Sequence, residues 1–231
     1  MDFLYDILVC IISAAFSSYT VYLFFNLFGK TRLKKRFTIL LLSLVISIFS
    51  ISLYFTSPGI LRTGLVFSCI LLISFTFRYK WYNYFLLTLL IYAIGSVIEF
   101  IVASVVSLIF SIDMTIVNDS KILYFSGLLL SKILQFLIVI VIKTQKHKVL
   151  NKSKAHLLTL MLFPISTIFI ILLQYNFFIN ITTENQSILY GALFSYVLLL
   201  FSNIYVFYYI DHMQENIDKS LALENANKLI K

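Results

Sequence analysis

Residues 82–111 read YNYFLLTLLIYAIGSVIEFIVASVVSLIFS, and this apolar stretch decides the fold class. Glu99 is its only acidic or basic residue. A helix of about 20 apolar residues is long enough to cross the ~30 Å hydrocarbon core of a bilayer. A longer run is accommodated by tilting or by projecting from the membrane. We therefore predict a transmembrane helix over these residues.

The composition of the whole chain agrees with this prediction. Hydrophobic residues make up 61% of the 231 and charged residues 12%, whereas a soluble domain has about 45–50% apolar and ~25% charged residues. Gly and Pro are scarce, with 6 and 2 residues. A transmembrane barrel would show alternating segments of roughly ten residues instead of long apolar runs. We expect an all-α integral membrane protein.

Apolar runs recur along the chain, separated by short polar segments. They cover residues 3–28, 37–55, 61–77, 82–111, 122–142, 155–178 and 188–210. The third is the shortest, yet each approaches the length that a membrane crossing requires. The sequence therefore predicts a multi-pass protein with about seven transmembrane helices over residues 1–210.

The charges between the runs predict the orientation. Residues 30–36, 78–80 and 143–154 hold twelve Lys or Arg and no acid. The alternate connections, 56–60 and 112–121 and 180–187, hold one Lys and three acids. Because cytoplasmic loops carry the excess of Lys and Arg, we place the first set inside and the N-terminus outside. We expect the plasma membrane as the location.

The net charge of +8 does not predict nucleic-acid binding. The cations lie in short connections between apolar runs and form no polar basic domain. Aromatic residues accompany them: Tyr79, Trp81, Tyr82 and Tyr84 lie around the second inner turn. Such a group is typical of an aromatic belt at the membrane interface.

A few ionisable residues lie inside the apolar runs and are candidates for a ligand-binding or gating site. They are Arg62, near the outer end of the third run, Glu99 in the fourth and Lys132 in the fifth. A charge at bilayer depth costs about 2.5–3.5 kcal/mol on insertion scales, so such residues normally pair or face a cavity.

Glu99 and Lys132 are expected at similar depths. At 1.5 Å per residue, Glu99 lies ~22 Å from the inner face and Lys132 ~15 Å from the outer face, which leaves a difference that a long Lys side chain can span. We predict an ion pair that lines or gates a ligand cavity. A static pair that only fixes helix packing, or a Lys that snorkels alone, is the alternative.

Further candidates lie in the outer connections and in the sixth run. Asp113, Asp119 and Glu184 are acids of the predicted outer loops, which suits an external peptide, although a solvated connector is the simpler interpretation. Pro164 removes a backbone donor in the middle of the sixth run and is a candidate hinge.

Motifs for catalysis are not found in the sequence. There is no HExxH, no Walker A motif, no GxGxxG, no GxSxG and no cluster of His, Cys and Asp. We expect no cofactor and no metal, and we do not expect this chain to be an enzyme by itself.

Residues 211–231, DHMQENIDKSLALENANKLIK, differ from the rest of the chain. They lack Gly and Pro and mix acids with lysines. We predict the start of a cytoplasmic signalling or dimerisation helix that continues the last transmembrane helix. A rigid continuation would carry motion of that helix into the cytoplasm.

The seven-run plan, the short loops, the polar helical tail and the stretch RYKWYNYFLL at 78–87 together resemble the sensor half of peptide-pheromone receptor histidine kinases. These are the quorum-sensing receptors of accessory-gene-regulator type in Gram-positive bacteria. The resemblance implies an extracellular peptide ligand, a homodimer and a two-component system. It also implies a kinase half after Lys231, with the phospho-accepting His and the ATP-binding part that these residues lack. A natural membrane protein without a kinase half is the alternative.

Two other functions remain open from the sequence alone. A small polytopic transporter or substrate-capture subunit would use Glu99 and Lys132 as a substrate or coupling site. A membrane scaffold would use them only for packing. The helical tail favours the sensor, because a transporter has little use for a helix that is poised to continue.

Overall fold

The computed structural model describes residues 2–54, 60–110, 112, 120–144, 154–179 and 186–229. In these ranges it contains seven helices, one at each apolar run. They are α1 (Asp2–Phe28), α2 (Lys35–Tyr54), α3 (Ile60–Ser74), α4 (Trp81–Phe110), α6 (Lys121–Thr144), α7 (Lys154–Ile179) and α8 (Gln186–Leu229). The all-α prediction is confirmed for the described part of the chain.

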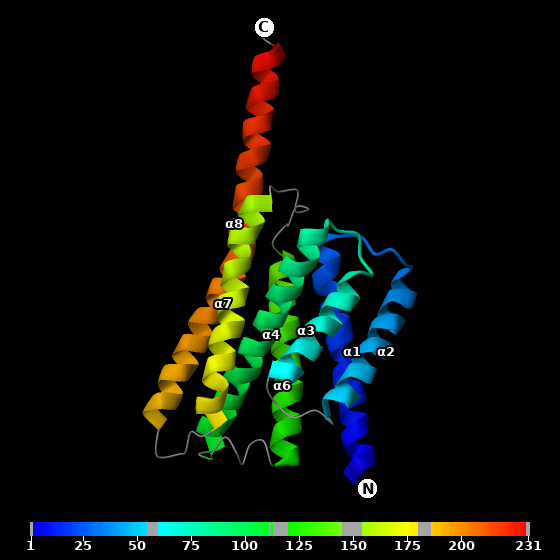
Figure 1. Cartoon of the computed structure of the whole chain (residues 1–231), viewed down its shortest axis with the longest axis vertical. Helices are drawn as coiled ribbons and strands as arrows, with labels where there is room; N and C mark the ends of the chain where they lie inside the picture. Colours follow the sequence, from blue (N-terminus) through cyan, green and yellow to red (C-terminus); the bar gives the residue numbers. More distant parts are fainter. Residues whose placement is uncertain are drawn as a thin grey trace.

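The helices stand side by side as one bundle (Figure 1). α4 is central: it packs against α3, α6, α7 and α8, whereas α1 packs against α2 and α6. The inward residues of α4 are fully buried, for example Leu86, Leu90 and Ile94. α4 therefore joins the half of the bundle that holds α1–α3 to the half that holds α7 and α8.

Large apolar side chains cover the outer faces of the bundle as well as its core. Leu40, Leu162 and Phe194 are each more than 60% exposed. Contiguous exposed apolar surface of this kind is unusual for a soluble monomer. It is the expected surface of a protein whose solvent is lipid.

Four helical segments in the described ranges are long and apolar enough to cross a membrane: Ile11–Phe28, Trp81–Phe110, Ile122–Thr144 and Ile188–Val206. Two shorter apolar segments, Thr63–Ser74 and Leu160–Gln174, accompany them. These lengths support a helical membrane protein, and the number of spans stays a prediction.

The third helix ends three residues earlier than the apolar run predicts. α3 ends at Ser74, and Thr76 and Phe77 form a turn in which their amides donate to the carbonyls of Ile73 and Ser74. Phe77 then pairs with Thr31 as an isolated antiparallel bridge. Pairing of the two loops, α1–α2 and α3–α4, therefore ends the helix, although the side chains remain apolar.

α8 is one uninterrupted helix of 44 residues. In Figure 1 its C-terminal part projects beyond the other helices, at the end of the bundle opposite the N-terminus. Residues 207–229, which follow its apolar segment, extend about 34 Å. The predicted continuation of the last apolar run into a polar helix is confirmed over these residues.

Candidate functional site

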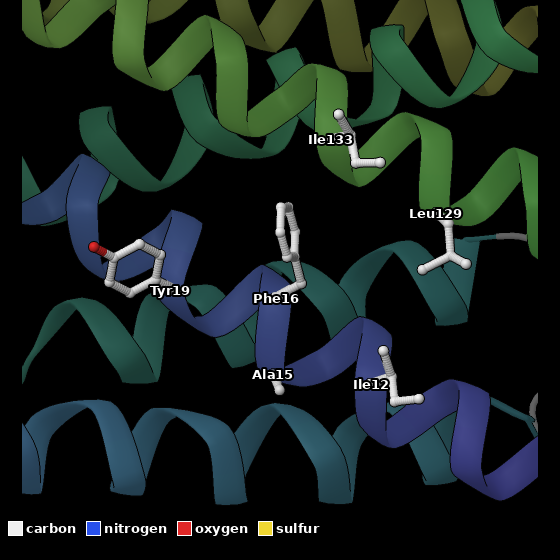
Figure 2. Close-up of a pocket in the computed structure, with 6 residues that line it drawn as sticks. All are labelled: Ile12, Ala15, Phe16, Tyr19, Leu129 and Ile133. Carbon is white, nitrogen blue, oxygen red and sulfur yellow. The ribbon is translucent and has the colours of Figure 1, made fainter.

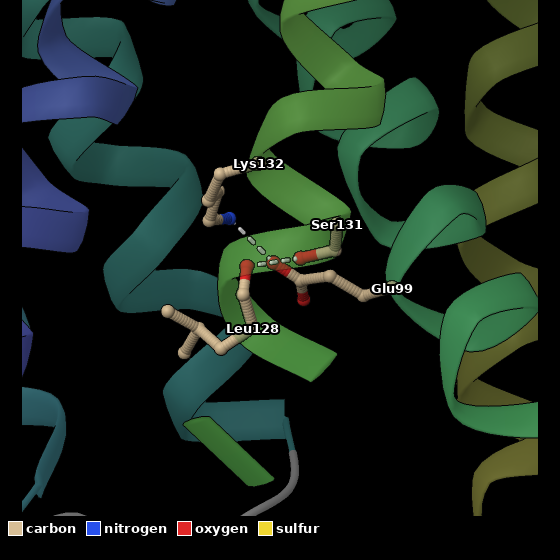
Figure 3. Close-up of polar contacts among 4 residues, drawn as sticks. All are labelled: Glu99, Leu128, Ser131 and Lys132. Atoms are coloured by element: carbon tan, nitrogen blue, oxygen red, sulfur yellow. Dashed lines mark hydrogen bonds and ion pairs between the residues drawn. The ribbon is translucent and has the colours of Figure 1, made fainter. Parts of the chain in front are cut away.

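Glu99 and Lys132 form an ion pair between α4 and α6 (Figure 3). The Lys132 ammonium Nζ donates to Glu99 Oε1 at 2.6 Å. The Lys132 side chain is 18% exposed and that of Glu99 is 53% exposed. Both residues lie inside the long apolar segments of their helices. The predicted contact is therefore confirmed, while its role in ligand binding or gating stays a prediction.

The position of α3 along α4 bears on the exposure of Glu99. Phe67 of α3 and Tyr92 of α4 stack edge to face with their ring centroids 6.3 Å apart, which fixes the register of these antiparallel helices. Seven residues from this contact, about 10 Å along each axis, Ile60 begins α3 at the level of Glu99. The described part of α3 therefore begins at the level of Glu99, whose side chain is 53% exposed beside Lys132.

Small and polar side chains also lie along the contact between α4 and α6. Gln135 is 8% exposed and lies so close to Gly95 that a Cβ on this glycine would be 2.9 Å from its Nε2. Ser131 is buried and donates its hydroxyl to the Leu128 carbonyl at 2.8 Å. We define Gly95, Glu99, Ser131, Lys132 and Gln135 as the α4–α6 polar seam.

A regular spacing in the sequence of α6 indicates this seam, but the predicted site residues do not include it. Gly127, Ser131 and Gln135 recur at intervals of four residues and therefore lie on one face of α6. Small residues at this spacing let membrane helices approach closely, and buried amides hydrogen-bond across such contacts. Gly191 does not serve in this way, because open space surrounds the position where its Cβ would lie.

Gly95→Ala is expected to lower the free energy of unfolding by about 1 kcal/mol, because the new methyl group displaces the amide of the buried Gln135. The cost is modest because the amide is the far end of a flexible side chain. On a Gln135→Ala background the same substitution is expected to stabilise, since alanine favours helix over glycine. SDS unfolding titrations of the four proteins measure both effects, and an equal cost on both backgrounds would contradict the contact.

The next residue of α4 contacts the long helix α8. Phe100 stacks on Tyr196 with their ring centroids 5.3 Å apart and an interplanar angle of 29°. Tyr196 is fully buried. Consecutive helical residues point about 100° apart, so one turn of α4 presents Glu99 to α6 and Phe100 to α8. The ion pair and the long helix therefore share one rigid element.

A buried polar contact joins α7 to α8. Asn203 Nδ2 donates to Thr167 Oγ1 at 2.7 Å and to the Leu199 carbonyl at 2.8 Å. Thr167 in turn donates to the Phe163 carbonyl at 2.9 Å. Pro164 is buried one turn away, inside the continuous α7. The helix thus runs through the proline, and its role as a hinge stays a prediction.

At the other end of α4, the α1–α2 loop and the α3–α4 loop bind each other. The Arg32 amide donates to the Thr76 carbonyl at 2.9 Å, and the Arg78 amide donates to the Lys30 carbonyl at 3.0 Å. Arg32 also donates through its guanidinium to the Phe77 carbonyl at 3.2 Å and to the Tyr84 hydroxyl at 3.0 Å. Arg32 is therefore committed to the fold despite its place in a basic loop.

Two aromatic residues of the same turn complete this loop pairing. The Tyr79 hydroxyl donates to the Phe25 carbonyl, and the Tyr84 hydroxyl donates to the Phe77 carbonyl at 3.0 Å. Burial raises the pKa of Tyr79, and the neighbouring Tyr84 adds to the rise, so the donor stays protonated.

The predicted aromatic belt is wrong for Tyr82 and Tyr84, because both side chains are buried in the bundle. Trp81, by contrast, is 64% exposed.

The remaining predicted site residues are not brought to the pair by the described contacts. Arg62 lies in the first turn of α3, and its side chain is outside the described part. Asp113, Asp119 and Glu184 lie outside the described residues. Their predicted part in ligand binding stays a prediction.

An apolar groove lies between α1 and α6 (Figure 2). It has a volume of about 440 Å³, and its lining residues are Ile12, Ala15, Phe16, Tyr19, Leu129 and Ile133. Phe16 packs edge to face against Phe136 of α6 with their ring centroids 5.4 Å apart. The groove offers hydrocarbon contacts almost exclusively, so the charged chemistry of the bundle lies at the ion pair instead.

Comparison of the chain with models of known families, with curated proteins and with solved structures finds no match.

Proposed function

We propose that this chain is the multi-pass sensor domain of a plasma-membrane receptor that recognises an extracellular signal, with a small peptide pheromone as the favoured signal. In this proposal seven helices cross the membrane with the N-terminus outside. The signal reaches the cytoplasm through α8, which drives a histidine kinase half in a homodimer. The resemblance carried by residues 78–87 and the arrangement of the helices motivate this assignment.

The observation that carries the proposal is the continuity of α8. One helix contacts α4 and α7 inside the bundle and leaves it without a break. A rigid helix transmits rotation or sliding at its packed end to its free end. The mixed charges of its last part, Asp218, Lys219 and Glu224 among them, suit a helix that pairs with a twin in water.

The charge distribution supports the orientation. The loops that hold Lys30–Arg36 and Arg78–Lys80 lie at the end of the bundle from which α8 projects (Figure 1). Lys143 lies in the last turn of α6, at the same end. Under the positive-inside rule this end faces the cytoplasm.

The ion pair supplies a site at which a signal can act. Glu99 is half exposed at the level where α3 begins, and its neighbour Phe100 touches Tyr196 of α8. A ligand group that competes for either charge would change the packing of α4 against α6 and α8. A shift of equilibrium requires only that the ligand bind the two arrangements with different affinity.

The proposal predicts that signalling depends on the rotational phase of α8. We would fuse the chain to a histidine kinase output domain and insert one to four alanines after Asn216, which is exposed. Each alanine turns the output by about 100°. One or two insertions are expected to abolish or invert the response to the peptide fraction of culture medium from the source organism, and three or four to restore most of it.

Two controls separate the effect of the rotational phase of α8 from the effect of its added length. An insertion of seven alanines restores the phase after two turns and is expected to restore the response, whereas a proline after Asn216 breaks the helix and is expected to abolish it. Autophosphorylation in membrane vesicles is the readout. A response that the proline leaves intact would overturn transmission through α8.

A further inference from the structure

Three exposed cations lie at the start of α2, and we name Lys34, Lys35 and Arg36 the α2 cation cluster. No acid is present in the first turn of this helix. Cations at a helix N-terminus are repelled by the positive end of the helix dipole. The cluster therefore adds its positive charge to that of the helix N-terminus. A negative group bound there would be stabilised by the three cations and by the helix dipole.

An exposed apolar stripe runs down α2 directly from this cluster. Its members repeat at helical spacing on one face and are Phe37, Leu40, Leu41, Leu44 and Ile48. Phe37 is 67% exposed and Ile48 is 54% exposed. The stripe is about 16 Å long. α2 lies at the edge of the bundle in Figure 1, and among the described helices it packs closely against α1 and α3.

We propose that α2 binds an anionic phospholipid, with its phosphate headgroup on the α2 cation cluster and one acyl chain along the apolar stripe. Clusters of cations at the cytoplasmic ends of membrane helices recognise anionic headgroups. An acidic soluble protein would match the charges, but the stripe enters hydrocarbon directly from the cluster, which places the cluster at the headgroup level of the bilayer, where an anionic headgroup is the nearest negative group. The contiguity of charge and stripe therefore favours a lipid.

Arg32 does not belong to the lipid site. Its guanidinium already donates to the Phe77 carbonyl and to the Tyr84 hydroxyl. The cluster can therefore be changed without breaking the hydrogen bonds that join the two loops. This separation makes the site testable in a folded protein. The proposal rests on the membrane placement of the proposed function and is independent of signalling.

Fluorescence quenching by brominated lipids tests the site, because Trp81 is the single tryptophan of the chain. In a Trp81→Phe protein, Phe37→Trp places the reporter beside the cluster and Ile48→Trp places it at the far end of the stripe. Each protein is reconstituted in phosphatidylcholine bilayers that contain an equal fraction of brominated phosphatidylglycerol or brominated phosphatidylcholine. The ratio of quenching gives the preference for the anionic lipid.

We expect about fivefold preference for phosphatidylglycerol at position 37, and a preference at position 48 as well, because the acyl chain of the bound lipid lies along the stripe. Replacing Lys34, Lys35 and Arg36 with alanine should reduce the preference at both positions to the bulk ratio of the two lipids. The charge-conserving set Lys34→Arg, Lys35→Arg and Arg36→Lys should keep it. A matched loss of three charges elsewhere, Lys143→Ala with Lys219→Ala and Lys228→Ala, should leave it unchanged.

Equal quenching by the two lipids at position 37 would overturn the proposal and leave a soluble acidic partner as the better explanation for the cluster. A preference that survives the triple alanine substitution would overturn it as well. Unaltered quenching by brominated phosphatidylcholine at position 48 in the triple variant reports that α2 is still folded and embedded. Because no kinase and no peptide are present, these outcomes do not depend on whether the chain signals.

Discussion

Glu99→Gln is expected to lower the free energy of unfolding by about 3 kcal/mol, the largest effect of any single substitution proposed for this chain. The substitution leaves the Lys132 ammonium without its carboxylate partner inside an apolar segment, where an unpaired charge costs about 2.5–3.5 kcal/mol. Lys132 is only 18% exposed, so water cannot replace the lost partner without movement of the helix.

Lys132→Met is expected to cost nearly as much as Glu99→Gln, about 2.5 kcal/mol. The stranded carboxylate is 53% exposed, but it lies inside an apolar segment, where surrounding lipid does not solvate a charge. The double variant should lie close to the wild type, since removal of both charges leaves neither unpaired. SDS unfolding titrations followed by Trp81 fluorescence give the four free energies of the double-mutant cycle.

Because the double variant is expected to lie near the wild type, the coupling free energy should be close to the sum of the two single costs, about 5 kcal/mol in magnitude. Additive effects of the two substitutions would contradict a direct ion pair. The same four proteins, fused to a kinase output, separate packing from sensing. If both single variants keep the full response to the peptide fraction, the pair has a structural role alone and the predicted gating role is wrong.

Gly29→Ala is expected to lower the free energy of unfolding by about 2 kcal/mol, at the high end for a single added methyl group. A Cβ at this position would lie 2.8 Å from Tyr79 Cδ1 and 3.0 Å from the Arg78 carbonyl oxygen. The Tyr79 ring stacks on Phe77, with an interplanar angle of 18°, and its hydroxyl is bound to the Phe25 carbonyl. The ring therefore cannot withdraw without loss of these contacts.

Two other glycines provide matched controls for Gly29→Ala. Gly64 and Gly191 have open space where a Cβ would lie, so alanine there should stabilise by up to about 1 kcal/mol through helix propensity. On a Tyr79→Ala background most of the cost of Gly29→Ala should disappear. SDS titrations measure all of these, and a neutral Gly29→Ala would contradict the close packing of the two loops.

Much of the fold was predictable because its causes are local. Apolar length places the seven helices, and the absence of Gly and Pro after Asp211 predicts the continuity of α8. The pairing of Glu99 with Lys132 was predictable too, because two opposite charges in neighbouring apolar runs have few other means of compensation. The cost of an unpaired charge in hydrocarbon therefore predicts this contact, as a sequence motif predicts a site in other proteins.

The rest of the site was not predictable because it depends on pairings between distant segments. The aromatic residues at 79–84 have the composition of an interfacial belt, but the structure buries Tyr82 and Tyr84, and Tyr84 hydrogen-bonds to Arg32 of another loop. Gln135 has no charge that requires a partner, so nothing in its own run indicates that it lies against Gly95.

The sequence alone therefore determined which segments are helical and which charges need partners, since length, apolar content and the cost of a buried charge are properties of each run. Only the tertiary structure decided that α4 is central and that Glu99 is half exposed. It also decided that Phe100 reaches Tyr196. These features depend on the order, register and rotation of the packed helices. Composition does not specify them, because the helix faces toward lipid and the faces toward protein are both apolar.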